Sequence, residues 1–173
     1  MTDDETIRGW LTGRLPADWF DGAPEVTVDR EEILVVGAVA APTLAEGTSA
    51  AEQAAAVAGR VREFRERTRD QRMRIAQELQ HLAGRTVSWG VTVDGHRELF
   101  TTASVPVMTR LRQPERAALD TLVDAGVARS RSEALAWCVK LVGRHSDEWL
   151  ASLRSAMTEV ERLRAAGPDA GAS

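Results

Sequence analysis

Two serines and two arginines stand together at the start of a helix-like segment, in the run Arg129-Ser130-Arg131-Ser132. The first N–H groups of a helix lack partners within the helix, and with the positive end of its dipole they attract anions. The short hydroxyls add hydrogen-bond donors and the arginines add positive charge. We therefore expect these four residues to contact phosphate groups. The alternative is an ordinary helix cap, because Ser130 and Glu133 have the spacing of a capping box.

A predicted strand and a predicted helix precede this run. Apolar and polar residues alternate in VPVMTRL, residues 105–111, as they do in a strand with two distinct faces. One face carries Val105, Val107, Thr109 and Leu111, and the other carries Pro106, Met108 and Arg110. A helix is predicted from Pro114, a residue suited to the first turn, to the stop signal at Gly126. The second helix begins at Ser130 and continues through SEALAWCVKLVGRH.

This order of strand, three-turn helix, glycine-containing connection and second helix resembles the ribbon-helix-helix superfamily of the Arc and methionine repressors. The resemblance covers residues 104–145 and rests on TRLRQPERAALDTLVDAGVARSRSEAL. It implies a two-fold homodimer, because one strand cannot form a sheet alone and the family pairs it with the same strand of a second chain. It also implies that this ribbon enters the major groove of double-stranded DNA.

The resemblance assigns base contacts to the outward face of the strand, here Pro106, Met108 and Arg110. Arg110 can donate two hydrogen bonds to one guanine. Met108 can make apolar contacts only, and Pro106 lies at the rim. The family usually carries polar or basic residues at these positions. The alternative function is therefore a protein-interaction or scaffold module, or an antitoxin, in which the ribbon-helix-helix unit serves only for dimerisation.

The net charge of −4 is unevenly distributed along the chain. Residues 1–48 carry three basic and ten acidic side chains, whereas residues 104–145 carry seven basic and four acidic ones. The positive excess thus includes the segment that resembles a DNA-binding unit.

No group of residues has the spacing of a catalytic or metal site. Asp29, Glu31 and Glu32 cluster at a predicted turn without a nucleophile or base nearby, and the three histidines lie far apart. We expect neither an enzyme nor a bound cofactor or metal. The N-terminus lacks the apolar region of a signal peptide, and no apolar stretch approaches the length of a membrane span. We therefore expect a cytoplasmic, nucleoid-associated protein without a membrane partner.

The first 103 residues are predicted to form a separate α-β-β-α-β-β domain, which makes the chain an α+β protein. A capping box at Ser49 and Glu52 begins a long helix that ends near Gly84, laid across a small antiparallel sheet. The pair Asp94-Gly95 predicts a two-residue hairpin turn. The sequence assigns this domain no role and leaves its partner open.

The predicted long helix carries a row of arginines in GRVREFRERTRDQRMR. Four of them are candidates for further contacts with a nucleic-acid backbone: Arg62, Arg65, Arg69 and Arg72. Acidic residues four positions before other arginines indicate instead a helix that is solvated or faces a protein partner.

Residues 146–166 are predicted to form an amphipathic helix, and residues 167–173 a disordered tail. The apolar row of this helix comprises Trp149, Leu150, Leu153, Met157, Val160 and Leu163. It predicts either a lid on the dimer core, with Trp149 and Trp137 as buried anchors, or an arm toward a protein partner. The overall expectation is a homodimeric DNA-binding regulator of transcription.

Overall fold

The computed structural model of the protein describes residues 2–166 of the 173-residue chain, so the predicted tail lies outside the described residues. The chain divides into two compact units, Met1–Val107 and Met108–Ser173. Helices and one mixed sheet make up the described fold, which confirms the predicted α+β class. The boundary between the units falls within the predicted ribbon strand, after Val107 rather than after residue 103.

The first unit follows the predicted order of elements, except that the long helix is divided in two. Its elements are α1 (Asp4–Arg14), β1 (Glu25–Val28), β2 (Glu32–Ala38), α2 (Ala50–Arg67), α3 (Arg69–Ala83), β3 (Thr86–Val93) and β4 (His96–Leu99). The predicted turn between β3 and β4 is confirmed, because Asp94 and Gly95 both have positive φ, at 49° and 77°. Ser49 and Glu52 form the predicted capping box at the start of α2.

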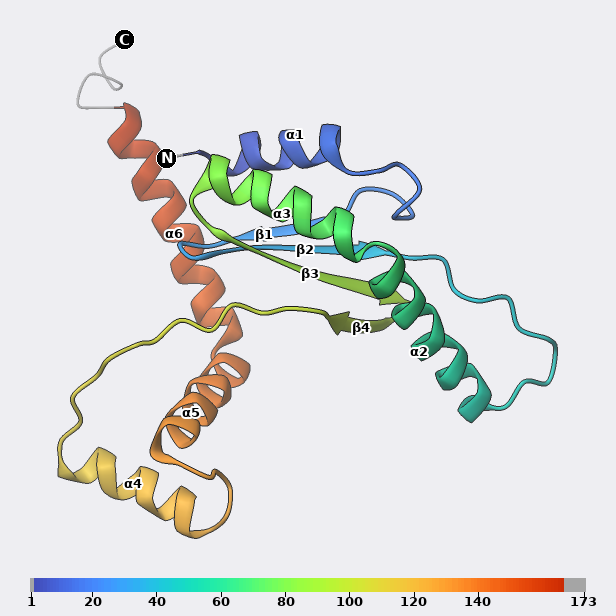
Figure 1. Ribbon diagram of the computed structural model, residues 1–173. Coiled ribbons are helices and arrows are strands. Elements are labelled where there is room, and N and C mark those ends of the chain that lie inside the picture. Colours follow the sequence, from blue (N-terminus) through green and yellow to red (C-terminus); the bar gives the residue numbers. More distant parts are fainter. Residues whose placement is uncertain (1, 167–173) are drawn as a thin grey trace. The chain divides into compact units, whose positions relative to one another are not determined.

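The sheet has the strand order β1-β2-β3-β4 and is mixed (Figure 1). The two hairpins, β1–β2 and β3–β4, are antiparallel. The central pair β2–β3 is parallel, with Ile33 opposite Val87. The prediction of an antiparallel sheet was therefore wrong in its centre. The cause is the crossover connection through α2 and α3. It returns the chain to the end of the sheet where β2 begins, so β3 starts beside the start of β2 and runs in the same direction.

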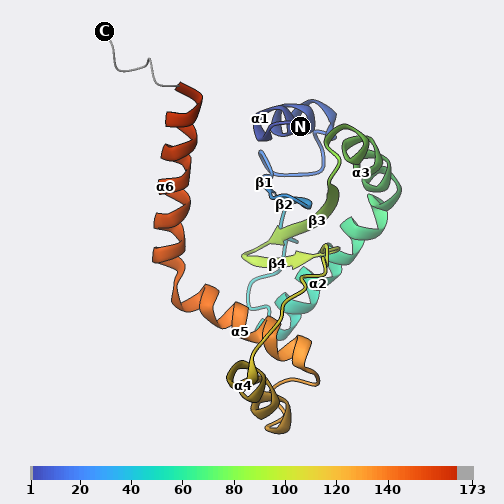
Figure 2. The ribbon, with the colours of Figure 1, turned by 90° about the vertical axis from the view of Figure 1, so that its left-hand side faces the viewer.

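The core of the first unit lies between the sheet and its helices. Both α2 and α3 pack on β3, and α1 packs beside α3 (Figure 2). Apolar residues at helical spacing form a buried stripe along α2 and α3, namely Val57, Val61, Phe64, Ile75 and Leu79. Phe64 also meets the buried Trp19 edge to face, at 5.9 Å between ring centroids. These contacts fix the helix pair on the sheet and thereby set which arginines face outward.

The predicted single helix breaks at Thr68, between α2 and α3. The Thr68 hydroxyl donates to the carbonyl of Phe64 at 2.7 Å, and its backbone N–H also bonds within the preceding turn. A threonine that bonds back to the preceding turn bends a helix. The sequence pattern did not reveal this break, because Thr68 continues the 3.6-residue stripe.

The second unit consists of α4 (Gln113–Asp124), α5 (Arg131–His145) and α6 (Asp147–Ala166). The predicted α4 is confirmed by the proline in its first turn and by the positive φ of Gly126, at 73°, after its end. The predicted α5 is confirmed by its cap at Ser130 and its end at His145. Only a small core joins them, with Leu119, Ala128 and Ala134 buried.

Residues 101–112 contain no regular secondary structure in the single chain, so the ribbon strand expected over 105–111 is not formed there. A strand requires hydrogen bonds from a neighbouring strand, and the pairing expected here involves a second chain. In α6 no residue is buried, and the Trp149 side chain, expected to be a buried anchor, is 62% exposed. Within one chain, α6 is thus not a lid. No helix among residues 2–166 is long and apolar enough to cross a membrane.

Candidate nucleic-acid interface

The start of α5 is capped by Ser130, whose hydroxyl accepts a hydrogen bond from the backbone N–H of Glu133 at 3.2 Å. The second half of the predicted capping box is displaced by one residue. The Glu133 carboxylate accepts from the backbone N–H of Arg129, at 2.9 Å, and from the Arg129 side chain, at 3.2 Å. The hydrogen bond from the Arg129 side chain holds the pKa of Glu133 below its usual range. Ser130 and Arg129 thus both take part in ending the connection and beginning α5.

Arg131, the next predicted phosphate contact, joins α5 to α4. Its Nε and Nη2 donate to the two carboxylate oxygens of Asp120, at 2.6 and 2.7 Å. These hydrogen bonds lower the pKa of Asp120 and raise that of Arg131. Both side chains remain partly open to solvent, so the pair is accessible to a competing anion. Ser132 is exposed beside it.

The two arginines predicted to contact phosphate are therefore each held by a carboxylate in the free protein. Sequence reasoning missed Asp120, because it lies 11 positions from Arg131 and on another helix. No local spacing indicates such a pair. It arises when the glycine-containing connection folds α5 back against α4.

The residues predicted to contact bases are all exposed. Met108 is 97% exposed, and Pro106 and Arg110 lie beside it along the same extended segment. Among residues 2–166, Arg110 has no carboxylate partner, unlike Arg129 and Arg131. Val107, which was expected on the inward face of the strand, is 85% exposed. Leu111 alone of that face packs against the small core of α4 and α5.

The four arginines proposed as additional backbone contacts do not behave alike. Arg62, Arg65 and Arg69 are exposed, whereas Arg72 is buried. The Arg72 Nε donates to the Thr68 hydroxyl at 2.9 Å, and its Nη2 donates to the Arg65 carbonyl at 2.7 Å. The expectation that Arg72 reaches a nucleic acid is therefore wrong, because its guanidinium is committed to the junction of α2 and α3.

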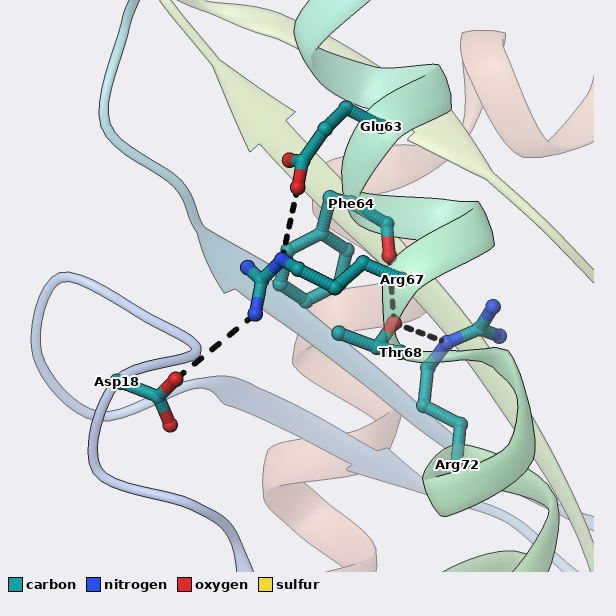
Figure 3. Close-up of polar contacts among 6 residues, drawn as sticks. All are labelled: Asp18, Glu63, Phe64, Arg67, Thr68 and Arg72. Carbon is teal, nitrogen blue, oxygen red and sulfur yellow. Dashed lines mark hydrogen bonds and ion pairs between the residues drawn. The ribbon is translucent and has the colours of Figure 1, made fainter.

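Figure 3 shows this junction together with a second arginine whose partners are carboxylates. Arg67 donates to Glu63 at 2.8 Å and lies 3.8 Å from Asp18, so it ties α2 to the loop after α1. The ion pair with Glu63 has the spacing that the sequence indicated. The contact with Asp18 could not be read from spacing, since it depends on how that loop folds over α2.

Comparison with known proteins relates both units to mycobacterial relatives. Residues 5–99 match the family described as "Rv1265-like protein, N-terminal domain", and residues 112–164 match the "Mb1296 C-terminal domain". The predicted ribbon segment falls between the two matched regions.

Two relatives illustrate the similarity: the uncharacterized proteins Rv1265 of Mycobacterium tuberculosis and Mb1296 of Mycobacterium bovis. Each is 63% identical over 160 residues, which cover 92% of this chain and 69% of the relative. No solved structure matches the chain. By the extent of these matches, the chain belongs to the Rv1265-like family.

Proposed function

We propose that the protein is a homodimeric, ribbon-helix-helix DNA-binding protein that regulates transcription. In the dimer, the 105–111 segments of two chains pair as a ribbon and insert Arg110 into the major groove. The N-termini of the two α5 helices then contact the flanking phosphates.

The observation that carries this proposal is the incomplete core of the second unit. Among residues 108–166, only Leu119, Ala128 and Ala134 are buried as an apolar core, which is far less apolar burial than a unit of this size needs for stability. At the same time, Val105 and Val107 in the segment expected to form the ribbon are exposed. Pairing of two strands would place both valines between the two copies and give the unit a shared core.

The charged groups of the second unit support the DNA-binding part of the proposal. Arg110 is exposed and unpaired with any carboxylate among the described residues, so it meets no competing anion before a guanine. Ser132 lies exposed at the α5 N-terminus, where a phosphate oxygen finds both its hydroxyl and the helix dipole. Arg131 is available if a phosphate replaces Asp120.

Fluorescence anisotropy with labelled duplexes of several sequences tests these roles. Arg110→Ala should relax the preference among sequences, and Ser132→Asp should weaken binding to all of them, because a carboxylate there repels phosphate. Ser155→Asp is the matched control, since Ser155 is exposed on α6 and the change adds the same charge. If the purified protein retains no duplex DNA even at low salt, the proposal fails.

A second candidate function is favoured by one observation, the exposed apolar row of α6. Its exposed members are Trp149, Leu153, Met157, Val160 and Leu163. In this alternative residues 104–145 serve only for dimerisation, and α6 or the first unit binds a protein partner. It predicts a stable dimer that binds no DNA, so the anisotropy experiment separates the two candidates.

A further inference from the structure

Two arginines of the first unit converge on one aromatic ring without a counter-charge. The guanidinium carbons of Arg65 and Arg72 lie 5.7 and 4.8 Å from the centre of the Phe100 ring. Among the described residues, neither guanidinium is within ion-pair distance of a carboxylate. Two like charges over one ring repel each other, so this arrangement favours an anion between or beside them.

The burial of Arg72 makes the missing counter-charge more significant. Its side chain belongs to a residue that is only 7% exposed, and its two hydrogen bonds go to neutral oxygens of Thr68 and Arg65. Buried charges in proteins are normally paired with an opposite charge. Burial, together with the charges of Arg65 and Arg69, lowers the pKa of Arg72 to about 10. The cation is thus held in an environment that disfavours it.

The neighbouring arginines lie on both sides of the α2–α3 junction. Arg65 is in the last turn of α2 and Arg69 is the first residue of α3, so the two flank the bend at Thr68, and Arg72 is tied to it through the Thr68 hydroxyl and the Arg65 carbonyl. Arg65 and Arg69 are exposed, and within residues 2–166 one carboxylate lies within ion-pair distance of Arg69, that of the adjacent Asp70 at 3.9 Å. An anion from solvent can therefore reach the guanidinium groups of Arg65 and Arg69 directly, and the buried charge of Arg72 attracts it as well.

We propose that Arg65 and Arg69 bind a phosphate group over the buried guanidinium of Arg72. Guanidinium groups match phosphate oxygens with paired, charge-assisted hydrogen bonds, which makes phosphate the anion that this cluster fits best. The site lies wholly within the first unit. It does not depend on the ribbon, on Arg110 or on a second copy of the chain.

Isothermal titration of the full chain with inorganic tripolyphosphate at low ionic strength tests the site. Arg65→Gln and Arg69→Gln should each lower the affinity by about tenfold, the effect of losing a charged hydrogen bond. Arg74→Gln is the control: Arg74 is exposed on α3, five residues after Arg69 and on the far side of the helix. It should change the affinity less than about twofold. Circular dichroism should show the same fold for all four proteins.

Two outcomes would overturn the proposal: no measurable binding of tripolyphosphate, or equal losses in the control and in the two site variants. Binding of a labelled DNA duplex by the same variants then identifies the source of the phosphate. If Arg65→Gln also reduces the salt slope of DNA binding by about one, the phosphate belongs to a nucleic-acid backbone. If DNA binding is unchanged while tripolyphosphate binding is lost, the site takes a free phosphorylated ligand. Either result supports the site.

Discussion

Removal of the Asp120 carboxylate is expected to strengthen DNA binding, because this carboxylate occupies Arg131 in the free protein. Arg131 uses two donors on the two oxygens of Asp120, at 2.6 and 2.7 Å. The same pair of donors cannot also hold a phosphate in the bidentate manner. In Asp120→Ala the guanidinium loses its partner and becomes available at the start of α5, where the helix dipole also attracts phosphate.

The size of the effect follows from counterion release. Each added phosphate contact steepens the dependence of log K on log salt by about 0.9. The proposed dimer contains two copies of Arg131, so the slope should steepen by about 1.8. Between about 50 and about 200 mM salt, affinity should then fall by a factor about twelve times larger in the variant than in the wild type.

Fluorescence anisotropy over this salt range measures the slope directly. Any loss of negative charge favours DNA binding to some extent, so the control must lose the same charge. Asp124→Ala provides it, because Asp124 is exposed on the same helix and has no ion pair among the described residues. Adding Arg131→Gln to Asp120→Ala should return the slope to near the wild-type value. Equal slopes for Asp120→Ala and Asp124→Ala would refute the assigned role of Arg131.

Three further predictions concern the first unit. Thr68→Val should lower the free energy of unfolding in urea by about 1–3 kcal/mol, because it leaves the buried Nε of Arg72 without its acceptor, and Thr68→Ser should recover most of the loss. Gly90→Ala should lower the melting temperature, since its Cβ would lie 2.8 Å from a backbone oxygen of β4. Gly9→Ala should instead stabilise the protein by about 0.5–1 kcal/mol, because the space around Gly9 in α1 is open. A lower melting temperature for Gly9→Ala than for Gly90→Ala would contradict the packing described. Glu78 accepts two hydrogen bonds from Arg14 of α1, and these lower the pKa of Glu78. Its contribution to stability should be present above its unfolded pKa and disappear as pH falls through the lower folded value. Arg14→Gln should raise the pKa of Glu78 measured by NMR, and an unchanged pKa would show that the pair does not form.

The sequence predicted local structure well where one short-range interaction decides it. The turn at Asp94-Gly95 depends on positive φ at two adjacent residues, and the start of α2 depends on a capping box formed by Ser49 and Glu52, three positions apart. The parallel pairing of β2 with β3 was missed because it depends on where a crossover of two helices returns the chain. The break at Thr68 was missed because the residue satisfies the helical stripe while its hydroxyl bends the backbone.

The candidate site was predictable in its residue types but not in its pairings. Spacing identified Ser130 as a cap and Arg110 as an exposed cation. Spacing could not identify Asp120 as the partner of Arg131, or the burial of Arg72 over Phe100, because each contact joins segments that only the fold brings together. Arg72 looked equivalent to Arg65 and Arg69 in the sequence, since helical periodicity places all three on one face.

The central claim is that two copies of this chain bind one DNA duplex through the second unit. Sedimentation velocity of the full chain with a labelled duplex at low salt tests it most directly, because it reports both the mass of the free protein and the composition of the complex. The account predicts a dimer that forms a complex of two chains per duplex and releases the DNA steeply as salt rises. A monomer, or a dimer that sediments separately from the DNA at low salt, would contradict it.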